Sequence, residues 1–302
     1  MASRSATQRD FACKTHAQSY PFISPLKLNL RGLHVLVTGA AFEDGVGFAV
    51  ATAFARAGAS RIALIDLHGV NEALTEKLKA AAVEAGRVEP VIIVGCVDIS
   101  QQQSVNTFQK RLSDKLDGRL DILVNNAAHQ EPYASFLESD PEQYSRTWDV
   151  NVHGLFNMAR AFLPMMLPRA AEEQRRNALM INVASSGALS VRAGSSAYRT
   201  SKLAILRWTE AIHLEYREQG LTAFCVNPGA IKTQMTVNEP EELRNRLPHK
   251  PEIAGDTIAW LTSESRTWLG GRYVSCPWDM EELLSRKDEI LGADKLKVRM
   301  LY

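Results

Sequence analysis

Short apolar segments alternate with helical segments along almost the whole sequence, and this alternation is the feature that most restricts the fold. Several of the apolar runs, such as HVLVT, DILV and ALMINV, are apolar at nearly every position. Runs of this kind are typical of strands buried on both faces, and their alternation with helices predicts a parallel sheet covered by helices on both sides. The expected strands are residues 34–38, 61–65, 91–97, 121–124, 178–183, 221–226 and 272–275, and the expected helices are 48–57, 71–85, 102–116, 141–164, 196–219, 251–262 and 280–291.

No linker, repeat or low-complexity segment interrupts the alternation, so we expect a single doubly wound α/β domain. Residues 31–276 form this domain, with an arm at 1–30 and a tail at 277–302. The arm is rich in Ser, Thr and Gln and nearly free of acidic residues, and it lacks the apolar core of a secretory signal. We expect a flexible arm, with a transit peptide as the alternative.

Composition excludes several kinds of partner. The formal net charge is only +1 and no basic stripe is present, so we expect neither nucleic acid nor a membrane surface as a partner. No apolar run approaches the roughly 18 residues of a membrane span. The cysteines (Cys13, Cys96, Cys225 and Cys276) are scattered, which predicts no metal site and a reducing, cytoplasmic setting.

A glycine-bearing turn, TGAAFEDGVG at residues 38–47, joins the first expected strand to an alanine-rich helix. This order is typical of a phosphate cradle, because glycine lets the backbone approach and the helix start offers N–H groups. The second expected strand ends at Asp66, whose carboxylate can bind both ribose hydroxyls and would repel a 2′-phosphate. The turn contains Glu43 and Asp44 but no Lys or Arg. We therefore expect NAD rather than NADP; capping of the next helix is the alternative role of Asp66.

A second polar group lies in MINVASSGALSVRAGSSAYRTSK, residues 180–202. Tyr198 and Lys202 are four residues apart, so on a helix their side chains share one face. A neighbouring ammonium favours the phenolate and lowers the pKa of a tyrosine, which makes Tyr198 a candidate general acid or base. Ser185 and Ser186 lie on the preceding loop, where a serine can bind the oxygen that exchanges the proton. A Tyr-x-x-x-Lys pair alone is more often structural, so the evidence for a catalytic role comes from the residues around it.

Taken in order over residues 31–275, these motifs resemble the short-chain dehydrogenase/reductase family, in particular its members from filamentous fungi. The resemblance implies a Rossmann-type sheet and a catalytic tetrad at Asn151, Ser185, Tyr198 and Lys202. The family's serine stands thirteen residues before its tyrosine, which favours Ser185 over its neighbour.

The resemblance also revises the interpretation of Asn151. Within the apolar stretch DVNVHGLF, an asparagine satisfied by the backbone is the simpler reading. The family implies instead that Asn151 holds a water beside Lys202, and that Lys202 binds the nicotinamide ribose. The implied cofactor-binding residues are Gly39, Gly45, Val46, Gly47, Asp66, Asp98, Ile99, Asn126, Ala127, Ala128, Tyr198, Lys202, Pro228, Gly229, Ile231 and Thr233.

Three departures from the family pattern stand out. Five residues, Ala40 to Asp44, separate the first two motif glycines where the family usually has three, so the phosphate loop must bulge. Ala128 replaces a glycine near the cofactor. The usual Asp-Gly-Gly end is replaced by Cys276-Pro277-Trp278-Asp279 and a longer tail.

The leading hypothesis is an NAD(H)-dependent oxidoreductase that interconverts a secondary alcohol and a ketone on an apolar small molecule, with Tyr198 as general acid or base. NAD preference would favour oxidation in a cytosol where NAD is mostly oxidised. One alternative is the same fold running a non-redox lyase, epimerase or cyclisation step, and another is a non-catalytic NAD-binding protein.

The segment 234–251 is charged and proline-containing and is expected to form a lid over the site. The resemblance implies a homodimer or homotetramer that pairs through the helices at 141–164 and 196–219. The candidate substrate-pocket residues are His129, Leu189, Arg192, Met235 and Trp278.

Overall fold

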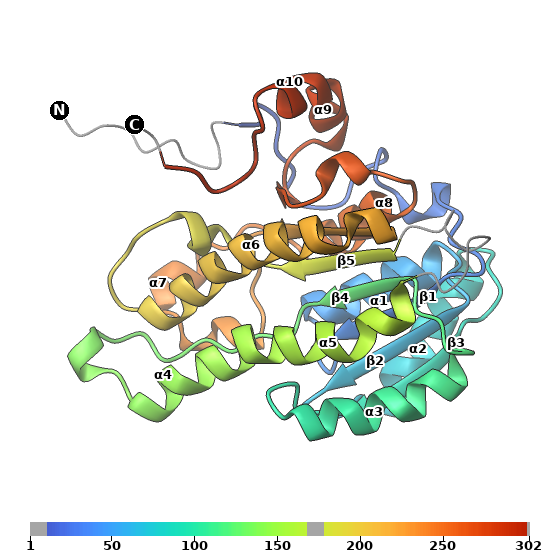
Figure 1. The fold of residues 1–302 in the computed structure, drawn as a ribbon, viewed down its shortest axis with the longest axis horizontal. Helices are drawn as coiled ribbons and strands as arrows, with labels where there is room; N and C mark the ends of the chain where they lie inside the picture. The colour runs from blue at the N-terminus through green and yellow to red at the C-terminus, as the bar shows by residue number, and fades with distance from the viewer. Residues whose placement is uncertain (1–10, 168–177, 301–302) are drawn as a thin grey trace.

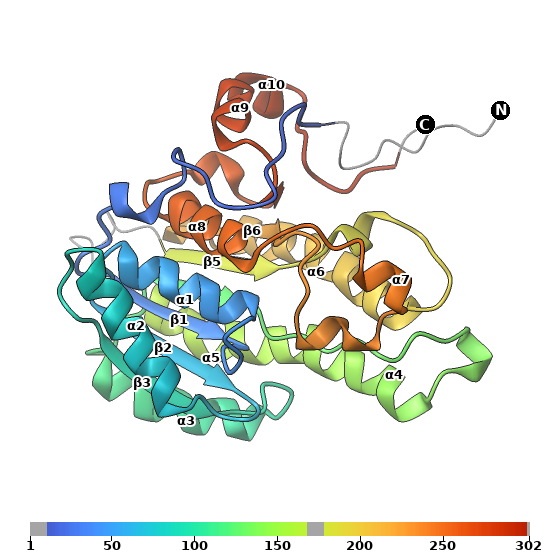
Figure 2. The same ribbon diagram turned by 180° about the vertical axis from the view of Figure 1, so that it is seen from behind.

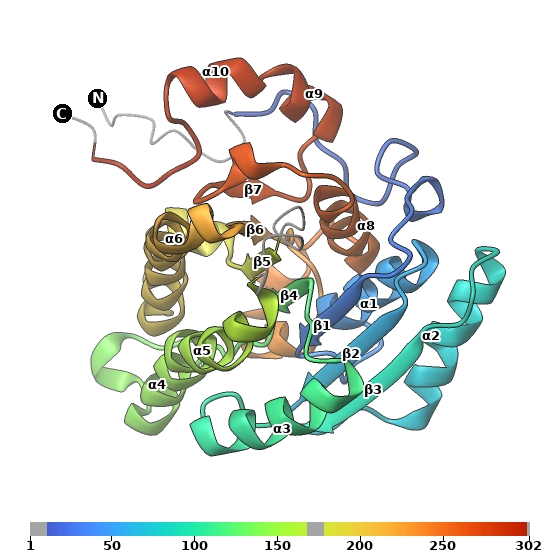
Figure 3. The ribbon, with the colours of Figure 1, turned by 45° about the vertical axis from the view of Figure 1, so that its right-hand side comes forward.

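The computed structural model describes residues 11–167 and 178–300, which form one seven-stranded sheet with helices on both faces. Residues 1–10 of the predicted arm and 301–302 of the predicted tail lie outside this description. The strands run parallel, as the sequence predicts, and their order in the sheet is β3-β2-β1-β4-β5-β6-β7 (Figure 3). They are β1 (His34–Thr38), β2 (Arg61–Asp66), β3 (Val91–Cys96), β4 (Ile122–Asn125), β5 (Ala178–Val183), β6 (Leu221–Asn227) and β7 (Tyr273–Ser275).

The central strands are buried because helices cover both faces of the sheet. Every residue of β1, β4, β5 and β6 is buried, whereas the edge strand β3 alternates between buried and exposed positions. Strand β1 lies between β2 and β4, so the strand order changes direction there. In such sheets ligands bind beyond the carboxyl ends of the strands at this point.

Helices α1, α2 and α8 lie on one face of the sheet (Figure 2), and α3, α4, α5 and α6 lie on the other (Figure 1). Phe54 belongs to one of the two apolar cores and Phe162 to the other. The helices are α1 (Val46–Arg56), α2 (Glu72–Glu84), α3 (Gln102–Lys115), α4 (Pro141–Trp148), α5 (Leu155–Met166), α6 (Ser196–Tyr216), α7 (Glu241–Arg244), α8 (Pro251–Thr262), α9 (Met280–Ser285) and α10 (Lys287–Gly292).

The helix expected at 141–164 is interrupted. Asp140 caps its start, accepting hydrogen bonds from the N–H groups of Glu142 and Gln143, as the sequence predicts. A π-helical turn, Asp149–Gly154, then separates α4 from α5 and carries Asn151. Such turns are rare and occur frequently at functional sites.

Residues 11–20 pack against the C-terminal residues beside β7, and residues 21–30 pack against α1 and α8, so the expectation of a flexible arm is wrong for both (Figure 3). Thr15 bridges to Trp278, the ring of Phe11 lies 4.9 Å from that of Trp278, and Ile23 is fully buried. The N–H of His16 donates to the carbonyl of Pro277 at 2.7 Å. Contacts of this kind leave no periodic pattern in the sequence.

The single helix expected at 280–291 is divided into two, α9 and α10.

In residues 11–167 and 178–300, no helix is long and apolar enough to cross a membrane. In the same residues, no three His, Cys, Asp or Glu side chains gather in a group that could hold a metal ion.

Candidate active site

The glycine turn between β1 and α1 keeps its outer glycines in contact. Gly39 has a φ of +71°, which glycine adopts without strain, and a Cβ on Gly47 would collide with the carbonyl oxygen of Gly39. Gly45 is the N-cap of α1, Val46 is the first helical residue, and no side chain caps this helix. The N–H groups of the first turn therefore remain available to a phosphate. This arrangement fits a dinucleotide.

The extra residues of the enlarged turn fold outward and do not separate these glycines. The N–H of Gly45 donates to the carbonyl of Phe42 at 3.0 Å, which closes a tight turn. The ring of Phe42 is 40% exposed and packs edge-on against His68. The predicted bulge is therefore local to the surface of the loop.

Asp66 ties this turn to the end of β2. Its carboxylate is buried and accepts hydrogen bonds from the N–H of Ala41 at 3.1 Å and of His68 at 3.0 Å. Asp66 does not cap the next helix, because the N-cap of α2 is Asn71, whose side chain accepts from the N–H of Leu74. The capping alternative for Asp66 is thus wrong.

The stretch after β4 is attached directly to the end of β1. The side chain of Asn126 donates to the carbonyls of Thr38 and Gly39, at 2.9 and 3.0 Å. The hydroxyl of Thr38 accepts from the N–H groups of Asn126 and Ala127. Ala128 follows and is half-buried. Asn126 and Ala127 thus fix the position of the glycine turn relative to β4.

Asp98 and Ile99 follow β3 at the same edge. Burial alone would raise the pKa of Asp98, but hydrogen bonds from Ser100 and the charge of Arg146 hold that pKa below its usual value. Arg146 lies 3.1 Å from the carboxylate of Asp98 and belongs to α4. Ile99 is buried.

Ser185 and Tyr198 come together at the carboxyl end of β5. Ser185 lies two residues after this strand, Tyr198 is in the first turn of α6, and the serine side chain is close enough to act on the phenol. Burial raises the pKa of Tyr198 to about 12, against the lowering effect of Ser185. Ser186 is exposed, and its N–H donates to the side chain of Asn227. Ser185 is therefore the serine that contacts the tyrosine.

Lys202 lies one turn further along α6, with its amino group directed at the backbone. Its Nζ donates to the carbonyl of Val183 at 2.8 Å and lies 5.7 Å from the ring centre of Tyr198. Burial lowers the pKa of Lys202 to about 8. The expected lowering of the Tyr198 pKa by Lys202 is not found, because the amino group binds Val183 and burial dominates both groups.

Asn151 is buried and anchors the loop after β4. Its Nδ2 donates to the carbonyl of His129 and to the hydroxyl of Ser201, and its Oδ1 accepts from the N–H of His129, all at 2.9 Å. The side chain is thus satisfied largely by backbone, as the simpler reading of the sequence predicted. One lone pair of Oδ1 is left for a further donor.

A small cavity of about 10 Å³ lies beside these residues, lined among others by Asn125, Asn151 and Lys202. A cavity of this size holds about one water molecule. Within the described residues, the Oδ1 of Asn125 is buried without a hydrogen-bond partner, while its Nδ2 donates to Asn182 at 2.8 Å. A water at this place would complete the hydrogen bonds of a buried polar group.

The segment after β6 turns back across the same edge. Gly229, which follows Pro228, has a φ of +111°, Ile231 pairs with His249, and Thr233 begins a short 3₁₀ turn, Gln234–Asn238.

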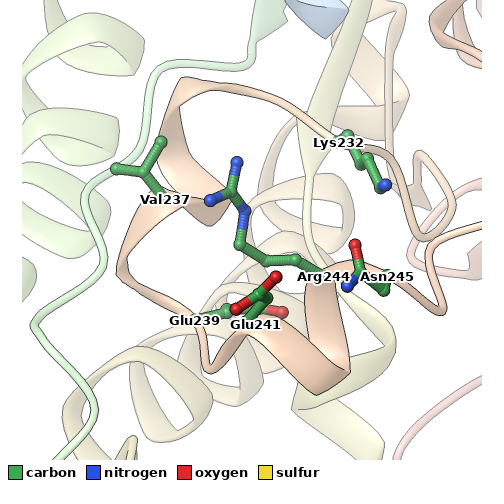
Figure 4. Close-up of a pocket in the computed structure, with 6 residues that line it drawn as sticks. All are labelled: Lys232, Val237, Glu239, Glu241, Arg244 and Asn245. Atoms are coloured by element: carbon green, nitrogen blue, oxygen red, sulfur yellow. The ribbon is translucent and has the colours of Figure 1, made fainter.

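A cavity of about 350 Å³ opens in this segment (Figure 4). Glu239, one of the residues that line this cavity, raises the pKa of Tyr198 through its charge. The Nε of Arg244 is buried and lacks a hydrogen-bond partner in the part of the chain described. The lining residues are Lys232, Val237, Glu239, Glu241, Arg244 and Asn245.

The candidate pocket residues come from separate segments of the chain and differ in exposure. The ring of His129 lies against Thr147, with Nδ1 3.1 Å from the hydroxyl. Leu189 and Arg192 are exposed on the loop before α6, and Met235 is half-buried in the turn after Thr233. Trp278 is buried and packs against Phe11 and Thr15.

Glu131 is a buried residue of this site that the sequence analysis missed. It lies in the loop after β4, and both of its carboxylate oxygens accept from the N–H of Tyr198. A single glutamate in a polar loop carries no sequence signal for this contact, since its partner is 67 residues away.

Comparison with known proteins places this site in a family. The sequence matches the short chain dehydrogenase family over residues 33–244. It is 42% identical over 288 residues to short chain dehydrogenase mpl6 of Monascus purpureus, covering 95% of each chain. It is 36% identical over 292 residues to short chain dehydrogenase andI of Emericella variicolor, covering 97% of each chain.

Solved structures of other proteins share this fold. A 3-ketoacyl-(acyl-carrier-protein) reductase from Brucella melitensis complexed with NADH superposes with a TM-score of 0.67 at 26% identity, covering 82% of this chain and 97% of that one. A 3-oxoacyl-[acyl-carrier protein] reductase from the same organism, in complex with NAD, has a TM-score of 0.71 over 81% of this chain and 95% of that one, and at 22% identity it supports the fold alone.

Fold and comparisons together define a Rossmann-type NAD(P)-dependent oxidoreductase. The chain belongs to the short-chain dehydrogenase/reductase family, and its fungal relatives confirm the resemblance drawn from the sequence.

Proposed function

We propose that the protein is an NAD(H)-dependent oxidoreductase that interconverts a secondary alcohol and a ketone, with Tyr198 as the proton-transferring residue. The observation that carries this proposal is the placement of the Ser185 side chain beside the phenol of Tyr198, beyond the end of β5. Two hydroxyl groups held together in this way can both bind one substrate oxygen. Bound nicotinamide would supply or accept the hydride at the adjacent carbon.

Each of the other residues has a role in this proposal. Ser185 orients the substrate oxygen, and Tyr198 gives it a proton during ketone reduction. The pKa of Tyr198, raised to about 12 by burial, keeps its phenol neutral at pH 7, which suits proton donation, so reduction is the direction to test first. The amino group of Lys202 and the side chain of Asn151 border the small cavity, and a water there would pass the replacement proton toward Tyr198.

For the cofactor we propose NAD. The turn at Gly39, Gly45 and Gly47 would hold the phosphates, and Asp66 would bind the adenosine ribose. A buried carboxylate at this position would repel a 2′-phosphate. The residues after β3 and β4 and the Pro228-Gly229 segment would complete the site, as the family resemblance implies.

The charged cavity of Figure 4 revises the expected substrate. Of its lining residues, Lys232, Glu239, Glu241 and Arg244 are charged, and only Val237 is apolar. We therefore propose a substrate that presents a polar group to this cavity, rather than the wholly apolar molecule expected from the sequence.

We also propose that the chain forms a homodimer or homotetramer through α5 and α6. Phe156 on α5 is 50% exposed and Leu203 on α6 is 38% exposed, so both offer apolar surface on the helices where the family resemblance places subunit contacts.

The first experiment is a titration of the protein with NADH and with NADPH, followed by quenching of its five tryptophans. Tight NADH and weak NADPH binding is the expected result, and it leads to a screen of ketones read at 340 nm. The opposite preference would overturn the proposed cofactor. Turnover without net change at 340 nm would point to the non-redox alternative, and binding of neither cofactor would point to a non-catalytic protein.

A further inference from the structure

The helix that carries Tyr198 is not capped by its own N-cap residue. Ser195 occupies the N-cap position of α6, but its side chain makes no cap hydrogen bond, and its hydroxyl accepts from the Nε of Arg199 at 2.9 Å. Tyr198 is the third helical residue, whose N–H an N-cap side chain ordinarily binds. That N–H donates to Glu131 instead, at 3.1 Å from both carboxylate oxygens.

Glu131 suits this role because it is buried and charged. Its side chain comes from the loop after β4, and the residue is only 3% exposed. A negative charge at a helix N-terminus is favourable because the free N–H groups there carry partial positive charge. The contact thus replaces the local cap with a stronger, charge-assisted one.

Further hydrogen bonds hold Glu131 in place. The hydroxyl of Thr147 lies 3.0 Å from Oε2 of Glu131 and 3.1 Å from the carbonyl of Gln143, and the carboxylate is the stronger acceptor for its one proton. Thr147 can then accept from the Nδ1–H of His129, at 3.1 Å. Asn151 binds the backbone of His129 on both sides. A continuous set of contacts therefore links the π-helical turn to the first turn of α6.

We propose that Glu131 is a positioning residue for Tyr198. By holding the N–H of Tyr198, its carboxylate fixes the first turn of α6 and with it the direction of the phenol toward Ser185. The importance of this for turnover rests on the proposed function, but the contact itself does not.

The charge and the hydrogen bond of Glu131 can be separated by substitution. The groups that act on the phenol of Tyr198 include Ser185, Glu239, Arg199 and Glu131, and the charge of Glu131 disfavours the phenolate. Glu131→Gln keeps an oxygen that can accept from the N–H of Tyr198 but removes the charge. Glu131→Ala removes both.

Hydrogen–deuterium exchange of the full chain, read by mass spectrometry, tests the contact without a substrate. In Glu131→Ala, exchange in the first turn of α6 is expected to rise about tenfold, the loss typical of a helix cap, while β5 and the second half of α6 stay unchanged. Glu131→Gln should restore most of the protection. Glu138→Gln is the matched control, because Glu138 lies exposed in the same loop and binds only Ser135 among the described residues.

An unchanged first turn in Glu131→Ala would overturn the proposal, and so would a rise spread evenly over the whole chain. If Glu131→Ala does not fold, Thr147→Val provides the test, since it leaves the carboxylate in place but removes one of its donors. A rise of about threefold confined to the same turn is expected there, and no rise would again overturn the proposal.

Kinetics with the first ketone that the wild type reduces add a readout that a purely structural role would not change. Glu131→Ala should lower kcat at an unchanged KM for NADH. Glu131→Gln should keep kcat within about threefold and move the alkaline limb of the pH profile to lower pH, because the phenol ionises more easily without the nearby charge. If the wild type reduces no ketone, but Glu131→Ala still loses protection in the first turn of α6, the result counts against the proposed function. It does not count against the contact.

Discussion

Asn151 binds both backbone groups of His129, with its Oδ1 2.9 Å from the N–H and its Nδ2 2.9 Å from the carbonyl oxygen. The loop after β4 is therefore clamped to the π-helical turn by one side chain. Because only an amide offers a donor and an acceptor side by side, no other residue of this size can make the pair.

Asn151→Ala should lower the free energy of unfolding by about 2–4 kcal/mol, because it leaves the N–H and carbonyl of the half-buried His129 without partners. Asn106→Ala, at an exposed position of α3, is the control and should change it by less than about 0.5 kcal/mol. Urea denaturation followed by circular dichroism measures both. Equal losses in the two variants would contradict the clamp.

Tyr198→Phe should reduce turnover by at least about 10³-fold while leaving the affinity for NADH unchanged, since it removes the proton but keeps the ring. Tyr144→Phe on α4 should stay within about twofold of the wild type. Steady-state kinetics at 340 nm and fluorescence titration give the two quantities. An active Phe variant at position 198 would rule out its assignment as acid or base.

Asp66→Ser should bring the affinities for NADPH and NADH closer together by about tenfold, because the repulsion of the 2′-phosphate is removed. Asp44→Ser removes an exposed carboxylate from the same turn and should leave the ratio unchanged. The comparison uses the two titrations described above. A ratio that responds equally to both substitutions would mean that general charge, not Asp66, sets the preference.

Lys202 should make stability depend on pH. Burial lowers its pKa to about 8 in the folded chain, against 10.5 when exposed, so between these values the unfolded chain binds more protons than the folded one. Stability contributed at this site therefore rises with pH across that window. The difference in unfolding free energy between the wild type and Lys202→Met should increase from pH 8 to pH 10.5.

Phe156→Glu should dissociate the proposed oligomer, because it puts a charge on the apolar surface of α5. Val88→Glu, at a position that is 85% exposed in the connection between α2 and β3, should leave the assembly unchanged. Analytical ultracentrifugation at micromolar concentration distinguishes the species. A monomeric wild type would refute the assembly itself.

The parts of the fold that sequence predicts correctly are those that local patterns specify. The strand at 178–183 and the helix at 251–262 have the predicted bounds, and Asp140 caps its helix, because apolar runs and capping residues act over a few positions. The spacing of Tyr198 and Lys202 likewise places both on one helix face. These features need no knowledge of distant partners.

The features that the sequence does not predict arise from contacts between segments that are distant in the chain. Glu131 is an ordinary loop residue until α6 comes to lie against it. The direction of the Lys202 amino group follows from its hydrogen bond to the backbone carbonyl of Val183. Because every residue has such a carbonyl, the sequence does not single out this one. The π-helical turn at Asn151 lies in a stretch whose pattern is that of a continuous helix. Only the assembled structure distinguishes these cases.

The packing of residues 11–20 on the C-terminal segment has a consequence for biosynthesis. His16 and its partner Asp279 are 263 residues apart, so at about 5–20 residues per second the ribosome needs roughly 13–50 s between them. During that interval the rings of Phe11 and Tyr20 lack the C-terminal residues that they contact, although the strands from β1 to β6 can already pair. The nascent chain therefore leaves these aromatic side chains exposed until translation is nearly complete.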